Sequence, residues 1–261
     1  MRTNHLALVA LAVSAFANAC VEQTTMLPTA SEFIVHAVLD GNLRDQYVIV
    51  QRTNGIISAQ APVTGAQVTI TAPDGRELIA DEVRDSAAIF AARSYQPRVT
   101  TVYRISLDKY GVALVPGGTY RLRVRIPADK AEIMGSTVMP AILPAPPNSP
   151  VPVVFTRSRD TLSLSWKEVA HAQGYVVTFS SPAETEVVFA DSSLTLAGTA
   201  RVFRIGMNSV VVSAVDVNYY DYFRRSSDVF SGSGLINHLE GGTGVFGSIS
   251  RLSTMTLDVR Q

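Results

Sequence analysis

The chain has 261 residues and carries 22 Lys and Arg against 22 Asp and Glu, so its formal net charge is zero. A chain of this length has room for two domains of ordinary size, each with its own core. A balanced charge argues against the strong positive field that nucleic-acid binding requires, and we expect no nucleic-acid partner.

The first residues have the organisation of a bacterial secretory signal. Arg2 supplies a positive start, an apolar stretch runs from Leu6 to Phe16, and the small residues Ala17-Asn18-Ala19 precede a cleavage point. The apolar stretch is too short to cross a bilayer as a helix. We therefore predict a signal peptide at 1–19.

Cys20, the only cysteine of the chain, is the predicted lipid-attachment residue. Its sulfur is the nucleophile that such a site offers for acyl-type modification, and a lone free thiol is a liability in an oxidising compartment. The alternative is ordinary cleavage after Ala19, which would leave a soluble secreted protein with a free thiol. The polar stretch 20–31 is expected to be a tether.

The segment 32–138 is predicted to be an N-terminal β-sandwich. Four stretches are rich in β-branched and aromatic residues and lack helical spacing, which is typical of strands: Phe33–Leu39, Tyr47–Arg52, Ala66–Thr71 and Tyr120–Ile126. Pro73-Asp74-Gly75 lies between two short strand-like runs. Because Asp-Gly tolerates the positive φ of a tight turn, this tripeptide predicts a hairpin.

One strand of this segment alternates cleanly between apolar and basic residues. Its two predicted faces carry Tyr120, Leu122 and Val124 on one side and Arg121, Arg123 and Arg125 on the other. We call the second set the arginine row. It is interpreted first as a solvated outer sheet face, and alternatively as a surface for anionic lipid headgroups or an acidic partner.

Two stretches of this segment, Pro62–Ile70 and Gly118–Leu122, resemble the small transthyretin-like or carboxypeptidase-regulatory-like modules of secreted proteins. Such modules have an immunoglobulin-like, two-layer architecture. The resemblance implies an all-β domain that serves as a spacer or binding unit and not as a catalyst.

A proline-rich stretch at 139–152 separates the two predicted domains. It holds six of the 13 prolines of the chain, which excludes a central strand or a helix interior. We expect an extended, semi-rigid linker.

The segment 153–261 is predicted to be a second β-sandwich. Thr161–Trp166 and Gly174–Phe179 resemble the B and C strands of a fibronectin type III domain, and Asn208–Asp216 would be its F strand, without the tyrosine usual near Asn208. Trp166, the single tryptophan, is expected to anchor the core between the sheets. The predicted fold is thus all-β, with two tandem immunoglobulin-like sandwiches.

The densest aromatic cluster follows the expected F strand, and it is the candidate surface for a partner or ligand. Its members are Tyr219, Tyr220, Tyr222, Phe223 and Arg224. If exposed, these rings could stack on a sugar or grip a partner. The alternative is that they cap the sandwich core as a short helical turn.

Other patterns suggest little chemistry. Asp216, Asn218 and Asp221 offer oxygen ligands to calcium but lack the rest of an EF-hand loop, and the histidines have no metal-type companions, so no metal is expected. The glycines at 242, 244 and 247 match a dinucleotide-binding pattern in letters only. A strand-like stretch follows them instead of a helix, which favours a glycine turn before the last strand and no cofactor.

Val212–Phe223 and Leu239–Ser248 resemble a family of uncharacterised bacterial envelope lipoproteins, and the likeness extends over nearly the whole mature chain. The resemblance implies association with outer-membrane receptor or uptake systems and brings no catalytic residues.

We therefore expect a non-enzymatic protein, anchored in the outer membrane by its lipid, that acts as an accessory or ligand-binding subunit beside an outer-membrane receptor. A small-molecule or glycan ligand is left unidentified. The alternatives are a structural or adhesive surface spacer and, third, a hydrolase with a site at the domain junction.

Overall fold

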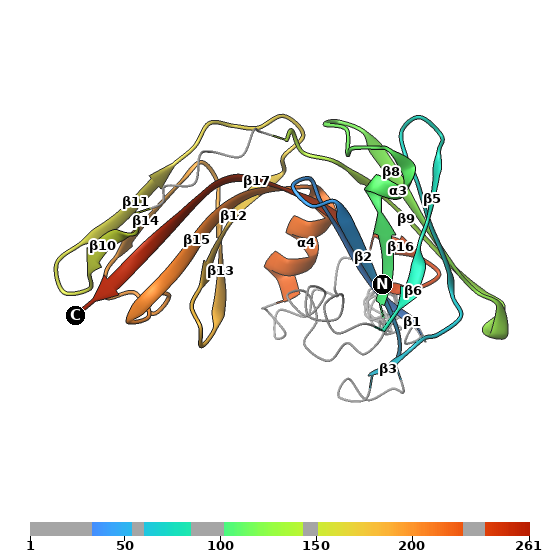
Figure 1. Ribbon diagram of the computed structural model, residues 1–261, viewed down its shortest axis with the longest axis horizontal. Helices are drawn as coiled ribbons and strands as arrows, with labels where there is room; N and C mark the ends of the chain where they lie inside the picture. Colours follow the sequence, from blue (N-terminus) through green and yellow to red (C-terminus); the bar gives the residue numbers. More distant parts are fainter. Residues whose placement is uncertain (1–32, 54–59, 85–101, 143–150, 227–237) are drawn as a thin grey trace, which may run out of the picture. The chain divides into compact units, whose positions relative to one another are not determined.

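A computed structural model describes residues 33–53, 60–84, 102–142, 151–226 and 238–261. The predicted signal peptide, Cys20, the tether and most of the proline-rich linker lie outside the described residues. The described part is an all-β fold with sandwich layers, as the sequence predicts (Figure 1).

The first sandwich consists of two facing sheets. One sheet contributes β1 (Phe33–Asp40), β2 (Asp45–Thr53), β3 (Gln60–Pro62), β6 (Asp81–Val83) and β7 (Val102–Ser106). The other contains β4 (Gln67–Thr71), β5 (Glu77–Ile79), β8 (Thr119–Ile126), β9 (Ala131–Val138) and β16 (Leu239–Glu240), in the order β16-β9-β8-β4-β5. Two short helices accompany them, α3 (Leu107–Tyr110) and the 3₁₀ helix η1 (Pro127–Asp129).

The inner faces of these sheets enclose the first core. Its largest buried side chains include Tyr103, Tyr120, Leu122, Ile70 and Phe246. The alternation predicted for β8 is confirmed, because its apolar residues are buried and the arginine row is exposed. The predicted hairpin is confirmed as well: β4 and β5 pair antiparallel, with Gly75 at φ 85° in the turn.

The second sandwich encloses a separate core. Its strands are β10 (Val153–Thr156), β11 (Thr161–Ser165), β12 (Gly174–Ser180), β13 (Thr185–Ala190), β14 (Ser193–Ala197) and β15 (Gly206–Val215). β11 pairs with β14 in one layer, while β13, β12 and β15 lie side by side in the other. Helix α4 (Val217–Ser226) follows β15 directly.

Aromatic rings at the centre of the second core differ from the expected arrangement. Phe203 is fully buried, and its ring centroid lies 4.6 Å from that of Phe155 and 5.5 Å from that of Phe179. Trp166 is only half-buried, and its ring centroid lies 5.4 Å from that of Tyr175. The tryptophan packs against the second core without occupying its middle.

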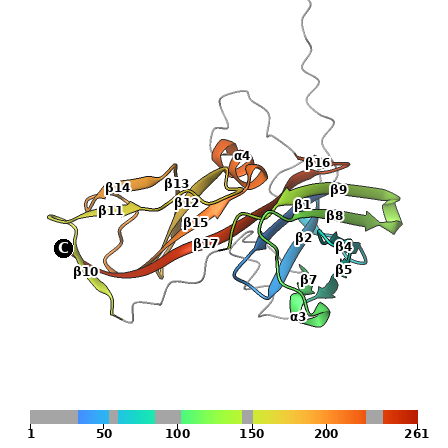
Figure 2. The same ribbon diagram turned by 90° about the horizontal axis from the view of Figure 1, so that it is seen from above.

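The last strand, β17 (Thr243–Arg260), belongs to both sandwiches (Figure 2). Its first part pairs parallel with β1, from Ile34 opposite Thr243 to Asp40 opposite Ile249. Its remainder pairs with β15 and β10. The segment 239–249, expected in the second sandwich, thus supplies hydrogen bonds to the first, and one sheet continues through both.

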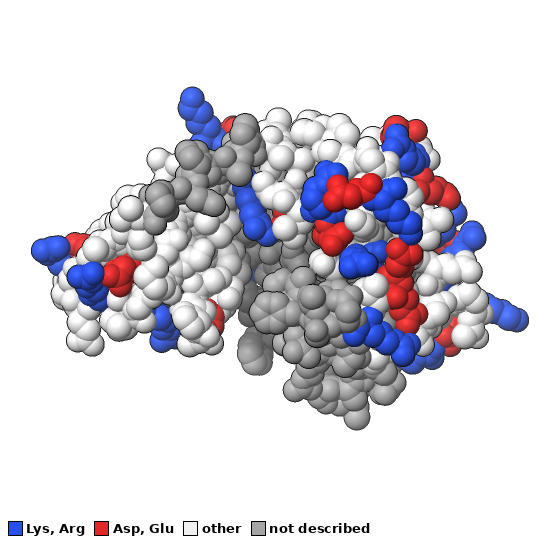
Figure 3. Space-filling model, viewed as in Figure 1, with Lys and Arg blue, Asp and Glu red and all other residues white. Residues whose placement is uncertain are grey.

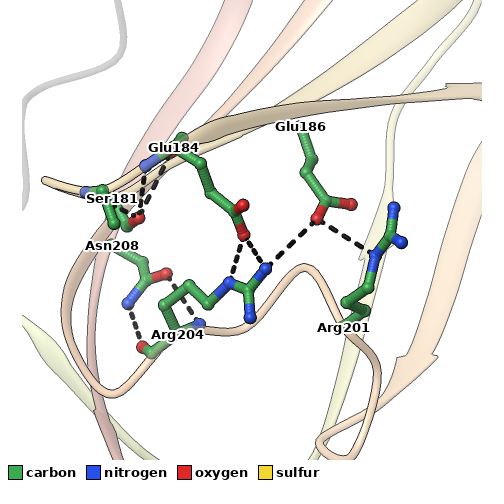
Figure 4. Close-up of polar contacts among 7 residues, drawn as sticks. Ser181, Glu184, Glu186, Arg201, Arg204 and Asn208 are labelled. Carbon is green, nitrogen blue, oxygen red and sulfur yellow. Dashed lines mark hydrogen bonds and ion pairs between the residues drawn. The ribbon is translucent and has the colours of Figure 1, made fainter.

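Polar contacts around Asn208 lie at one end of the second sandwich (Figure 4). This buried amide donates to the carbonyls of Arg204 and Gly206 at 2.6 and 2.8 Å and accepts from the Arg204 amide at 3.2 Å. The Arg204 guanidinium pairs with Glu184, which lies in the turn between β12 and β13. These bonds tie the start of β15 to a neighbouring turn.

Charges on the described surface are largely paired. On the face shown in Figure 3, basic and acidic side chains alternate over the first sandwich, whereas the second shows mainly uncharged residues. Arg44 with Asp108, and Lys109 with Asp81 at 2.9 Å, are examples of these pairs. Within the described residues, no helix is long and apolar enough to cross a membrane.

Candidate functional site

The five residues of the predicted aromatic surface all lie on α4. Its backbone approaches the sheet closely because glycines stand beneath it. A Cβ atom at Gly247 would lie 3.0 Å from Tyr219 Cβ, and one at Gly174 would lie 2.5 Å from the ring of Tyr220. A larger residue at either glycine would push the helix away from the sheet.

The rings of α4 pack on one another and on neighbouring strands. The centroid of Tyr219 lies 4.4 Å from that of Phe223, which lies 5.1 Å from that of Tyr222. Tyr222 meets the His36 ring of β1 edge to face, with the centroids 5.6 Å apart. Burial raises the pKa of Tyr219 to about 12 and also raises the pKa of Tyr222.

Arg224 is the exposed member of the set. Its guanidinium carbon lies 4.9 Å above the ring of Tyr220, and its Nη1 donates to the Tyr220 hydroxyl. The Tyr220 ring in turn meets Phe189 of β13, with centroids 5.6 Å apart. The strand residues that these rings contact, Gly174, Phe189 and His36, alternate with residues of the two cores and so face away from them. Helix α4 therefore covers the outer face of the sheet, and it is a ten-residue helix instead of the short core-capping turn considered as the alternative.

Asp216 connects the start of α4 with both sandwiches. Its Oδ2 accepts from the Thr137 hydroxyl of β9 at 2.6 Å, and its Oδ1 accepts from the amides of Ser248 and Tyr219 at 2.9 and 3.0 Å. The bond from Tyr219 caps the helix. Burial raises the pKa of the Asp216 carboxyl, although the bonds from Thr137 and Ser248 oppose that shift.

The three oxygen ligands considered for calcium are engaged separately. Asn218 Nδ2 donates to the carbonyls of Ser136 and Phe246 at 2.5 and 2.7 Å, and Asp221 Oδ2 lies 3.1 Å from His238 Nε2. Together with the donors on Asp216, these bonds give each side chain its own partners. Among the described residues, no group of three or more His, Cys, Asp or Glu is arranged to hold a metal ion.

The glycine pattern forms a turn and a strand, as predicted. Gly241, with φ 76°, and Gly242 connect β16 to β17, while Gly244 and Gly247 lie within β17. A Cβ at Gly244 would lie 2.0 Å from the Val35 carbonyl oxygen, so glycine allows β17 to approach β1. The pattern therefore serves strand packing.

A cavity of about 300 Å³ lies on the outer face of the first sandwich, over β8, β9 and β16. We call it the outer groove. Its lining includes Arg121 and Arg123 of the arginine row, Ser136, His238 and Glu240. The pair between Asp221 and His238 connects this groove to α4. Sequence reasoning found the arginines but missed Glu240, because its position depends on the pairing of β16 with β9.

A second cavity, of about 490 Å³, lies at one end of the first sandwich. Leu78, Leu114 and Tyr120 line its apolar part. At its rim, Arg76 and Asp74 form an ion pair at 3.1 Å. This second cavity thus offers an apolar lining, and Arg76 and Asp74 at its rim pair with each other. The outer groove, in contrast, is lined mainly by polar side chains.

The fold and these sites define an all-β sandwich protein with a polar groove on one sheet. Neither a family model nor a curated protein matches the sequence. Among solved structures, one titled "Ca2+-stabilized adhesin helps an Antarctic bacterium reach out and bind ice" matches with a TM-score of 0.20 and 14% identity. The match covers 89% of this chain and 50% of that chain, so this chain spans half of that structure's length. A likeness at this level carries no functional argument.

Proposed function

We propose that this chain is a lipid-anchored, non-enzymatic protein of the bacterial cell envelope that acts as an accessory or ligand-binding subunit of an outer-membrane receptor. The proposal of an anchor is supported by the positive start, the short apolar stretch and the cysteine at position 20. The binding role is carried by one observation, the outer groove with its polar lining.

The second sandwich is proposed to be fibronectin type III-like. Strand pairing supports this assignment, because β12 lies between β13 and β15, and β11 pairs with β14 in the opposite layer. In such an arrangement Asn208 takes over the backbone hydrogen bonds that a corner tyrosine makes in related sandwiches. The first sandwich is proposed to be transthyretin-like.

The test of the anchor is intact-mass spectrometry of the protein from its native envelope. We expect a mature N-terminus at Cys20 with diacylglyceryl and acyl mass added. The Cys20→Ser variant is the matched control and should carry neither. An unmodified Cys20 in the wild-type protein would make it a secreted soluble protein and contradict the anchor.

The test of the accessory role is mild crosslinking in the envelope followed by purification. We expect an outer-membrane receptor to be recovered consistently with the wild-type chain and to be lost with Cys20→Ser. Recovery of the chain without any membrane partner would favour the spacer alternative. That alternative is supported by β17, which joins both sandwiches into one continuous sheet suited to projecting a surface.

A further inference from the structure

The outer groove brings opposite charges from two strands to its two sides. Arg121 of β8 lies opposite Ser136 of β9, and Glu240 of β16 lies opposite Met134 of the same strand. With β9 between them, the backbones of β8 and β16 are about 10 Å apart, and the two positions are offset by about 7 Å along the strands. The groove separates a guanidinium from a carboxylate.

Among the described residues, neither Arg121 nor Glu240 has an ion-pair partner, in contrast to the other members of the arginine row. Arg125 and Arg123 share one partner, the carboxylate of Glu132, at 2.8 and 3.4 Å. Arg121 is the member of the arginine row that this carboxylate does not contact. In the part of the chain that the structure describes, Arg121 and Glu240 form no ion pair with each other or with another residue. The arginine row thus exceeds Glu132 by two positive charges, and Arg121 and Glu240 are the two lining residues available to pair with a ligand.

Polar groups between these charges favour a small hydrophilic ligand. Thr71 lies beside Arg121 on β4, and Ser136 supplies a second hydroxyl on the floor of the groove. His238 is held at the rim by Asp221 of α4 at 3.1 Å. A volume of about 300 Å³ is at the lower end of small-molecule sites and too small for a folded partner.

We propose that the outer groove binds a small zwitterion, an amino-acid-like molecule whose carboxylate is bound by Arg121 and whose ammonium group is bound by Glu240. A guanidinium matches a carboxylate with two parallel hydrogen bonds, and a carboxylate accepts from an ammonium group. This inference rests on the proposed ligand-binding role and names the class of ligand.

The test is calorimetric titration of the full chain with glycine, β-alanine and 4-aminobutanoate, whose charges are separated by increasing distances. We expect saturable binding of at least one of them. Arg121→Gln and Glu240→Gln should each raise its dissociation constant about tenfold or more, as expected for loss of a charge-assisted bond. Butanoate and butylamine, which carry one charge each, should bind at least tenfold more weakly.

Arg201→Gln and Glu168→Gln, both on exposed positions of the second sandwich, are the matched controls and should bind like the wild-type chain. Absence of saturable binding by all three zwitterions, or equal affinity in the groove and control variants, would overturn the inference. Neither result would affect lipidation at Cys20 or receptor recovery, so failure of this ligand class is distinguishable from failure of the proposed function.

Discussion

Replacing Asp216 by alanine is expected to destabilise the chain by about 2–4 kcal/mol. The carboxylate accepts three hydrogen bonds, from Thr137 at 2.6 Å, from Ser248 at 2.9 Å and from Tyr219 at 3.0 Å. Losing the helix cap at Tyr219 costs about 1 kcal/mol. Leaving the buried Ser248 amide without a partner costs about 1–3 kcal/mol. Loss of the bond from Thr137 adds little to this cost, because its hydroxyl lies 3.0 Å from Ser248 Oγ and can donate to that atom instead.

Asparagine at the same position is expected to cost only about 1 kcal/mol near neutral pH. Its oxygen can accept from the two amides, while its Nδ2 can donate to the Thr137 hydroxyl. Burial raises the pKa of the Asp216 carboxyl, so the stabilising contribution of its protonated form is lost as the pH rises through the folded-state pKa. Relative to wild type, Asp216→Asn should therefore gain stability from pH 4 upward.

Urea unfolding of the full chain measures these differences, with far-UV circular dichroism as the signal. Asp258→Ala is the matched control, because this aspartate of β17 pairs with the exposed Arg260 at 2.7 Å and a surface pair contributes at most about 1 kcal/mol. An Asp216→Ala variant within about 0.5 kcal/mol of wild type, or one equal to Asp216→Asn, would refute the role of this carboxylate as a hydrogen-bond centre.

Urea transitions followed by Trp166 fluorescence and by circular dichroism are expected to coincide, because β17 lies in the sheet that covers both cores; two separate transitions would contradict this. Gly244→Ala should cost about 3 kcal/mol or more, since its φ is 118° and its Cβ would meet the Val35 carbonyl, whereas Gly65→Ala, with open space at φ 72°, should cost about 1 kcal/mol. If the two substitutions lowered the melting temperature equally, the result would argue against a close approach of β17 to β1 at Gly244. Burial lowers the pKa of His36 to about 4. The stability that the neutral imidazole contributes is therefore fully present above about pH 6.5 and is lost as the pH falls toward 4. The loss amounts to about 3 kcal/mol at most. His36→Phe should weaken the pH dependence of the urea midpoint between pH 7 and 4.5. The same pH dependence as in the wild-type chain would count against this role of His36.

Local patterns of the sequence predicted the local structure well. The alternation in β8 and the Asp-Gly turn after β4 depend on neighbours within a few residues, so period and turn chemistry suffice to identify them. Phe203 carries no such signal. It lies between β14 and β15 in a segment without periodicity, and only the folded chain shows that it occupies the centre of the second core where Trp166 was expected.

Long-range pairing set the limit on predicting the site. Val35 of β1 and Gly244 of β17 are far apart in sequence, and no local pattern reveals that the two strands run parallel side by side. The position of Glu240 opposite Met134 follows from the same kind of pairing. The arginine row could therefore be predicted as one face of a strand, but the acidic side of the outer groove could not.

The outer groove and the junction between the cores depend on the same segment of the chain. Glu240 forms one side of the groove and is followed, after the glycine turn, by β17, whose residue Ser248 donates to Asp216. Directional bonds of this kind hold strands in one arrangement more strictly than apolar contacts, which tolerate sliding. Asn218 adds two more by bridging the carbonyls of Ser136 and Phe246. Since Ser136 also lines the groove, the polar junction fixes the floor of the proposed ligand site as well as the join between the two sandwiches.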